Sequence, residues 1–198
     1  MKNILTYLSI LLLSITLLCS TSTAQKTRSG KDNEVVTTYV KAVDLIQVGN
    51  FQELEEIINK IADSKVLTAD GRRKLEELYT ELMEMDEVLL DRWITGTPNS
   101  AHPYIVRGKF NLRSAQQKLI EAGQYTFRQP KGDIKLLLRK AQADLEKAGQ
   151  LDPTNAAPPS ELVAIAMYRG YPSHLMNQWF SDAVEADPFW LGSYRNKL

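Results

Sequence analysis

Apolar residues recur at helical spacing along nearly all of the chain that follows Glu34. The first stripe falls on one helical face at intervals of three and four residues and comprises Val36, Tyr39, Val40, Val43 and Ile46. Gly49 ends this helix, and a second stripe of Phe51, Leu54, Ile58 and Ile61 begins two residues later. A connection this short makes the two helices antiparallel neighbours.

Two further hairpins are predicted by the same spacing. A long third helix runs from Leu75 to Trp93, with Thr68 or Asp70 as its cap, and Gly96 and Pro98 end it. Asn99 or Ser100 caps a fourth helix, whose inward residues are Tyr104, Gly108, Leu112, Ala115, Leu119 and Ala122. Residues 123–132 contain two glycines, a proline and two aromatics, which predicts a loop. A fifth helix follows, capped by Asp133, with Ile134, Leu137, Ala141, Leu145 and Ala148 inward.

The last part of the chain adds three helices. A sixth begins at Pro158 and ends near Gly170, a seventh begins at Ser173, and an eighth begins at Pro188. The inward residues of the seventh are Met176, Phe180 and Ala183. No stretch shows the alternation of a β-strand, so we expect an all-α fold of stacked antiparallel helical hairpins.

The first 24 residues have the composition of a secretory signal peptide. Lys2 precedes a short apolar run, and small residues lead to Ala24, so we expect cleavage between Ala24 and Gln25 and a periplasmic or secreted protein. Two alternatives are a lipoprotein anchored at Cys19 and an uncleaved anchor, although the run is shorter than the about 20 residues of a membrane span. Residues 25–33 are expected to be a flexible linker to a helical domain of residues 34–198.

Composition narrows the function classes. The chain has 198 residues, 43% hydrophobic and 24% charged, which is typical of a globular protein. Basic and acidic residues both number 24, so no overall charge points to nucleic acid. Cys19 is the single cysteine, which excludes a disulfide or a cysteine-based metal site within the chain.

A pattern of apolar residues and a proline recurs 35 residues apart. Ala141, Leu145, Ala148 and Pro153 have the same spacing as Met176, Phe180, Ala183 and Pro188, and an aspartate precedes each proline. We expect the third residue, alanine, to let a neighbouring helix approach closely, the aspartate to cap the next helix, and the proline to take its first position. The pattern resembles the second helix of a tetratricopeptide repeat, which implies an α-solenoid. Tyr104 and Gly108 after Pro98, and the pair Gly49 and Phe51, are similar to other positions of this repeat.

A narrower resemblance is also present. Gly49-Asn50-Phe51, Trp93 before Pro98-x-Ser100, Val106-Arg107-Gly108, and the pairs Asp152-Pro153 and Asp187-Pro188 resemble a bacterial family of exported and cytosolic repeat-like proteins. That family is defined only as a domain of unknown function, so it implies an architecture and no activity. Its members usually continue beyond the position of Tyr194 with a glycine-rich segment that contains tryptophan. We therefore expect the last hairpin to be incomplete here.

Familiar catalytic patterns are missing from the sequence. The chain that follows Ala24 has no cysteine, and His102 and His174 both stand at predicted helix starts, where we expect them to face solvent. No metal-ligand spacing and no phosphate-binding glycine loop is present, so no cofactor is expected. Carboxylate clusters such as Glu76-Glu77 are expected to be solvated helix faces, and the tryptophans and methionines to be packing residues. We therefore expect a non-enzymatic protein, with a small exported enzyme of unrecognised site as the alternative.

Charge is unevenly distributed along the chain. Residues 51–98 hold six basic and twelve acidic residues, net −6, whereas residues 103–140 hold nine basic and two acidic residues, net +7. Either the two segments stack and neutralise each other, or the basic segment faces an anionic partner. The candidate binding surface comprises Arg107, Arg113, Tyr125, Phe127, Arg139 and Lys140. We expect a binding or scaffold module for a protein partner, with membrane contact only through the signal segment or a lipid on Cys19.

Overall fold

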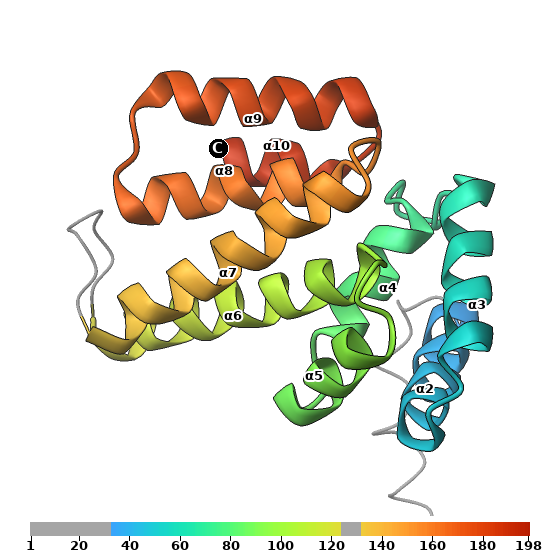
Figure 1. Ribbon diagram of the computed structural model, residues 1–198. Helices are drawn as coiled ribbons and strands as arrows, with labels where there is room; N and C mark the ends of the chain where they lie inside the picture. The colour runs from blue at the N-terminus through green and yellow to red at the C-terminus, as the bar shows by residue number, and fades with distance from the viewer. Residues whose placement is uncertain (1–32, 124–131) are drawn as a thin grey trace, which may run out of the picture. The chain divides into compact units, whose positions relative to one another are not determined.

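The computed structural model describes residues 33–123 and 132–198, which form helices joined by short loops (Figure 1). The helices are α2 (Asn33–Val48), α3 (Phe51–Ser64), α4 (Lys74–Leu82), α5 (Glu87–Gly96), α6 (His102–Glu121), α7 (Gly132–Leu151), α8 (Ala157–Arg169), α9 (Ser173–Ala186) and α10 (Leu191–Lys197). Within these residues there is no β-strand, only an isolated bridge between Leu67 and Arg73, so the all-α prediction is confirmed for this part of the chain. None of these helices is long and apolar enough to cross a membrane.

Several predictions concern residues outside the described ranges. These are the signal peptide with its cleavage site between Ala24 and Gln25, the lipid site at Cys19, and nearly all of the linker. Tyr125 and Phe127, which come between α6 and α7 in the sequence, also lie outside them.

Helices α2 and α3 form the first hairpin. Gly49 takes a left-handed conformation, with φ of 77°, and Asn50 begins α3 by accepting the backbone N–H of Glu53 and donating to its carboxylate at 2.9 Å. The inward face of α3 is as predicted, since Leu54 and Ile58 are fully buried. The inward face of α2 is not, because its buried residues are Val35, Ala42, Leu45 and Ile46, whereas Val36 and Val40 are exposed. Helix α2 has apolar side chains on more than one face, so their spacing alone does not show which face is buried.

The predicted long third helix is two helices. Helix α4 ends at Leu82, and α5 begins after Asp86, whose carboxylate accepts the backbone N–H of Val88 at 2.8 Å. The prediction was wrong because apolar residues continue across the break, where Asp86 caps a new helix. The proposed caps Thr68 and Asp70 also do not cap α4; they bond to each other in the turn that precedes it, which the bridge between Leu67 and Arg73 closes.

The long helices α6 and α7 lie antiparallel (Figure 1). Gly108 permits their close approach, because a Cβ at this position would lie 2.8 Å from Cγ of Leu145. Leu112, Ala115, Leu119, Ile134, Leu138 and Ala141 fill the interface. Most of the predicted inward residues of both helices are therefore buried.

Helices α8, α9 and α10 pack together at the C-terminal end of the described chain (Figure 1). Gly170 ends α8 in a left-handed conformation with φ of 66°, as the sequence predicts. Ala148 and Ala183, the two alanines of the recurring pattern, are both fully buried. Their burial agrees with the small side chain expected where helices meet.

The loop between α5 and α6 and the loop between α9 and α10 share one kind of hydrogen bond. The hydroxyl of Tyr104 donates to the carbonyl of Pro98, and that of Tyr194 donates to the carbonyl of Pro188, at 3.3 and 3.1 Å. Each tyrosine is six residues after its proline. The same tyrosine-to-proline hydrogen bond therefore occurs in two loops that are 90 residues apart in the sequence.

Candidate functional site

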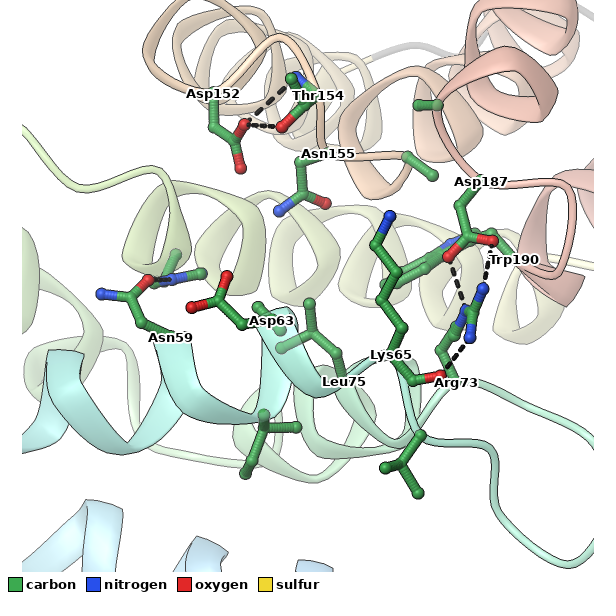
Figure 2. A pocket seen from close by; sticks show the side chains of 16 residues that line it. Asn59, Asp63, Lys65, Arg73, Leu75, Asp152, Thr154, Asn155, Asp187 and Trp190 are labelled. Carbon is green, nitrogen blue, oxygen red and sulfur yellow. Dashed lines mark hydrogen bonds and ion pairs between the residues drawn. The ribbon is translucent and has the colours of Figure 1, made fainter.

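A polar cavity of about 310 Å³ lies where five parts of the fold meet (Figure 2). Its walls are the C-terminal end of α3, the start of α4 with the segment before it, the start of α6, the loop from α7 to α8, and the loop from α9 to α10. Side chains of both charges line it, together with two asparagines and one histidine. A cavity that gathers convergent polar groups is the default candidate for a binding site.

The end of α3 brings two charged side chains to the cavity. Lys65 follows the last residue of α3 in a left-handed conformation, with φ of 50° and ψ of 24°, and its N–H bonds to the carbonyl of Ala62. Asp63 and Lys65 extend from this end toward the loop that carries Asn155 (Figure 2). Both residues are exposed, and among the described residues neither side chain makes an ion pair or a hydrogen bond. These two charges are therefore available to a ligand.

The two Asp-Pro loops line the cavity opposite α3. The carboxylate of Asp152 accepts the backbone N–H and the hydroxyl of Thr154, at 3.1 and 2.7 Å, and that of Asp187 accepts the N–H of Phe189 at 2.9 Å. The aspartates therefore close turns, and the prolines lie within those turns. The prediction that they cap and start the next helix was wrong, because α8 begins only at Ala157 and α10 only at Leu191.

Arg73 fixes the second of these loops to the start of α4. Its guanidinium donates twice to Asp187, from Nε at 2.6 Å and from Nη2 at 2.9 Å, and it also lies 5.2 Å from the ring centre of Phe189. Burial alone would raise the pKa of Asp187, but the hydrogen bonds and charge of Arg73 outweigh it and the pKa is lowered. The two hydrogen bonds fix the positions of Arg73 and Asp187, and the two charges neutralise each other.

His102 is bonded within the protein at both ring nitrogens. The Tyr79 hydroxyl lies 2.6 Å from Nδ1, and Oδ1 of Asn59 lies 2.9 Å from Nε2. Because an amide oxygen only accepts, Nε2 carries the hydrogen, and Nδ1 accepts the tyrosine proton. The amide of Asn155 donates to the same hydroxyl at 3.3 Å.

Burial controls the ionisation of this group. It lowers the pKa of His102 and raises that of Tyr79, so both side chains are held neutral. The prediction that His102 faces solvent was wrong: it is 6% exposed, because Tyr79 and Asn59 approach it from α4 and α3. His174, at the start of α9, is exposed as expected.

Glu76 and Glu77 are also buried, at 1% and 2% exposure, against the prediction of a solvated face. Glu76 accepts the backbone N–H of Leu191 at 3.1 Å and Nη2 of Arg195 at 2.6 Å. Burial raises the pKa of Glu76, and the nearby charge of Arg195 opposes that rise. The partners lie more than 110 residues away in sequence, so local spacing could not reveal them.

The predicted basic surface lies mainly among carboxylates. Arg107 donates twice to Asp144, at 2.9 and 2.6 Å, and once to Asp91 at 2.7 Å. Arg113 pairs with Glu84, and Lys140 approaches Glu87 at 3.4 Å, whereas exposed Arg139 has no polar partner among the described residues. The pairs with Asp91, Glu84 and Glu87 connect the basic segment to the acidic one, as the neutralisation hypothesis expects.

Sequence reasoning missed the α3 side of the cavity. Asn59, Asp63 and Lys65 stand at ordinary polar positions of a helix end, and no motif marks them. The recurring Asp-Pro pairs lie in the two loops that form the opposite walls, although the sequence pattern predicted helix starts at these positions.

The described residues contain no group of three or more histidine, cysteine, aspartate or glutamate side chains placed to hold a metal ion. Comparisons of the chain with protein-family models, with curated proteins and with solved structures found no match.

Proposed function

We propose that this chain is a non-enzymatic, exported helical-repeat module that binds a segment of a partner protein in the polar cavity. The observation that carries the proposal is the pair Asp63 and Lys65 at one wall, an acceptor and a donor that make no side-chain hydrogen bond or ion pair with the described residues. Asp152, on the opposite wall, uses only one of its oxygens in its own turn. Donors and acceptors on facing walls suit the alternating N–H and C=O groups of a peptide backbone.

The contacts of the polar side chains support binding over the enzymatic alternative. A general base needs a nitrogen or oxygen within reach of a substrate proton. Both nitrogens of His102 bond to Tyr79 and Asn59, and the hydroxyl of Thr154 donates to Asp152. These side chains therefore hold one another in fixed positions, and the two ring nitrogens of His102 are already used within the protein.

The tetratricopeptide-like class and the export remain parts of the same proposal. Support for the class comes from the shared loop design and from the buried alanines of the 35-residue pattern. For export, the support is the composition of residues 1–24. N-terminal sequencing of the native protein should give Gln25 first; a start at Met1 in a cytosolic fraction contradicts export, and lipid on Cys19 selects the lipoprotein.

The binding proposal is tested by capture from envelope extract on the immobilised full chain. Asp63→Ala with Lys65→Ala should lose the partner retained by the wild type. The matched control is Glu56→Ala with Lys60→Ala, which removes the same two charges from exposed positions of α3 that do not line the cavity.

Two results would contradict the cavity as the site. Equal capture by both double variants shows that the cavity is not used. Loss of capture on Arg139→Glu alone assigns the partner to the basic surface, because this side chain has no ion pair with the described residues that the change would disturb.

A further inference from the structure

A second hollow, of about 760 Å³, lies between the C-terminal half of α7, the start of α8 and the last turns of α9. It meets the polar cavity at the loop of residues 152–155 and at Ala186 but is otherwise lined by different residues. The three helices lie next to one another in Figure 1. We call this hollow the α7–α9 groove.

The floor of the α7–α9 groove is apolar. Leu145 and Leu162 belong to the hydrophobic core, and the partly buried Trp179 packs against that core. Gly149 also lines the groove beside Pro158, and an added Cβ there would make an ordinary contact of 3.8 Å with the Cβ of the proline. An apolar side chain placed here would bury surface against leucine and tryptophan, which is favourable.

The rim of the groove carries charge of one sign. Of the residues that the structure describes, its charged ones are Glu146, Asp152, Asp182 and Glu185, and no lysine, arginine or histidine lines it. Glu146 accepts an amide hydrogen of Gln142, and Asp152 bonds within its own turn. Asp182 and Glu185 make no ion pair or hydrogen bond with the described residues.

This rim differs from the other charged surfaces of the fold. The basic segment is interleaved with carboxylates, and the polar cavity contains both Lys65 and Arg73. Four carboxylates around an apolar floor produce a negative potential that nothing in the groove neutralises. A cation on Asp182 or Glu185 would therefore replace no existing internal pair.

We propose that the α7–α9 groove binds a cationic amphipathic protein segment, in which arginine or lysine alternates with large apolar residues. The apolar side chains cover Leu162 and Trp179, while the basic side chains reach the carboxylates of α9. An arginine can also stack on the indole of Trp179, since guanidinium groups bind preferentially over tryptophan. The floor favours a protein segment over a small polyamine, which has no large apolar side chain to place there.

This inference does not rest on the polar cavity as a site. The test measures fluorescence anisotropy of three labelled twelve-residue peptides with the full chain. The first alternates arginine or lysine with leucine, the second replaces each basic residue by glutamate, and the third replaces each leucine by serine. The first should bind, should weaken as salt is added, and should exceed both others at least tenfold in affinity.

Variants locate the binding. Asp182→Asn with Glu185→Gln should weaken binding about fivefold to tenfold, as expected for two solvent-exposed ion pairs. Asp44→Asn with Glu56→Gln makes the same change in net charge on α2 and α3 and should leave affinity unchanged. Trp179→Phe keeps an aromatic ring and should give an intermediate loss.

Three outcomes overturn the inference. Equal binding of the serine peptide shows that the apolar floor is not used, and equal effects of the two double variants show only general charge attraction. Loss of peptide binding on Asp63→Ala with Lys65→Ala, without an effect at Asp182 and Glu185, places the segment in the polar cavity and leaves the groove empty.

Discussion

Two helix-interior glycines provide a matched test of the packing between α6 and α7. Gly108 lies in α6 and Gly149 in α7, and neither has a positive φ. Replacing a helical glycine by alanine stabilises the backbone by up to about 1 kcal/mol wherever the methyl group has room. The two sites differ in the space available for that methyl group, so the difference in stability between the two variants measures the effect of packing.

At Gly108 the added methyl group collides with the neighbouring helix. Its Cβ would lie 2.8 Å from Cγ of the fully buried Leu145 and 3.3 Å from the carbonyl oxygen of Ala141. Such overpacking costs about 1–3 kcal/mol, which outweighs the gain in helix propensity. At Gly149 the nearest atom is Cβ of Pro158 at 3.8 Å, an ordinary contact. We therefore expect Gly108→Ala to be less stable than Gly149→Ala by about 2 kcal/mol.

Thermal unfolding followed by far-UV circular dichroism measures this difference. For a chain of this length each kcal/mol shifts Tm by about 2–4 °C, so the two variants should melt roughly 5 °C apart. Gly149→Ala should melt at or above the wild type, and Gly108→Ala below it. If Gly108→Ala gains as much as Gly149→Ala, the close approach of α6 to Leu145 is refuted.

Three further predictions concern buried positions. Ala183→Leu should cost about 1–3 kcal/mol by overpacking, and an unchanged Tm would remove Ala183 from the helix interface. Because burial lowers the pKa of His102, the unfolded chain binds a proton at this position that the folded chain does not bind. The free energy of unfolding should therefore fall as the pH drops from about 7 to about 5, and it should fall less steeply in His102→Gln. The same pH dependence in both proteins would contradict this. Arg73→Ala should cost about 3 kcal/mol in urea unfolding because it strands Asp187, whereas Lys118→Ala, which removes the exposed pair with Asp133, should leave the free energy of unfolding nearly unchanged. Similar losses would show that the Arg73 pair contributes no more than an exposed one.

Helix limits were predictable wherever the chain carries its own stop signal. Gly49 and Gly170 end α2 and α8 through backbone conformations that glycine favours, and Asn50 caps α3 with local bonds. The break between α4 and α5 also has a local signal in Asp86, which was hidden because apolar residues continue across it. Local chemistry therefore determines most element boundaries.

Burial of polar residues was not predictable by the same reasoning. His102 is covered by Tyr79, which is 23 residues earlier, and Glu76 is bonded by Arg195, which is 119 residues later. A helical face that reads as polar can turn inward when a distant segment supplies the matching charge. The candidate cavity was not predicted, since Asp63 and Lys65 acquire their position from the tertiary fold and the Asp-Pro pairs were expected at helix starts.

The bonds from α4 to the last helix have a consequence for synthesis and folding. In a stack whose units touch only their neighbours, each unit can fold as soon as it is made. Here Leu191 and Arg195, which bond to the carboxylate of Glu76, are synthesised more than 110 residues after it, and so is Asp187, the partner of Arg73. A ribosome adds about 5–20 residues per second, so the early helices spend several seconds with these charges unpaired. Folding of the first helices should therefore finish only after the last ones have been synthesised.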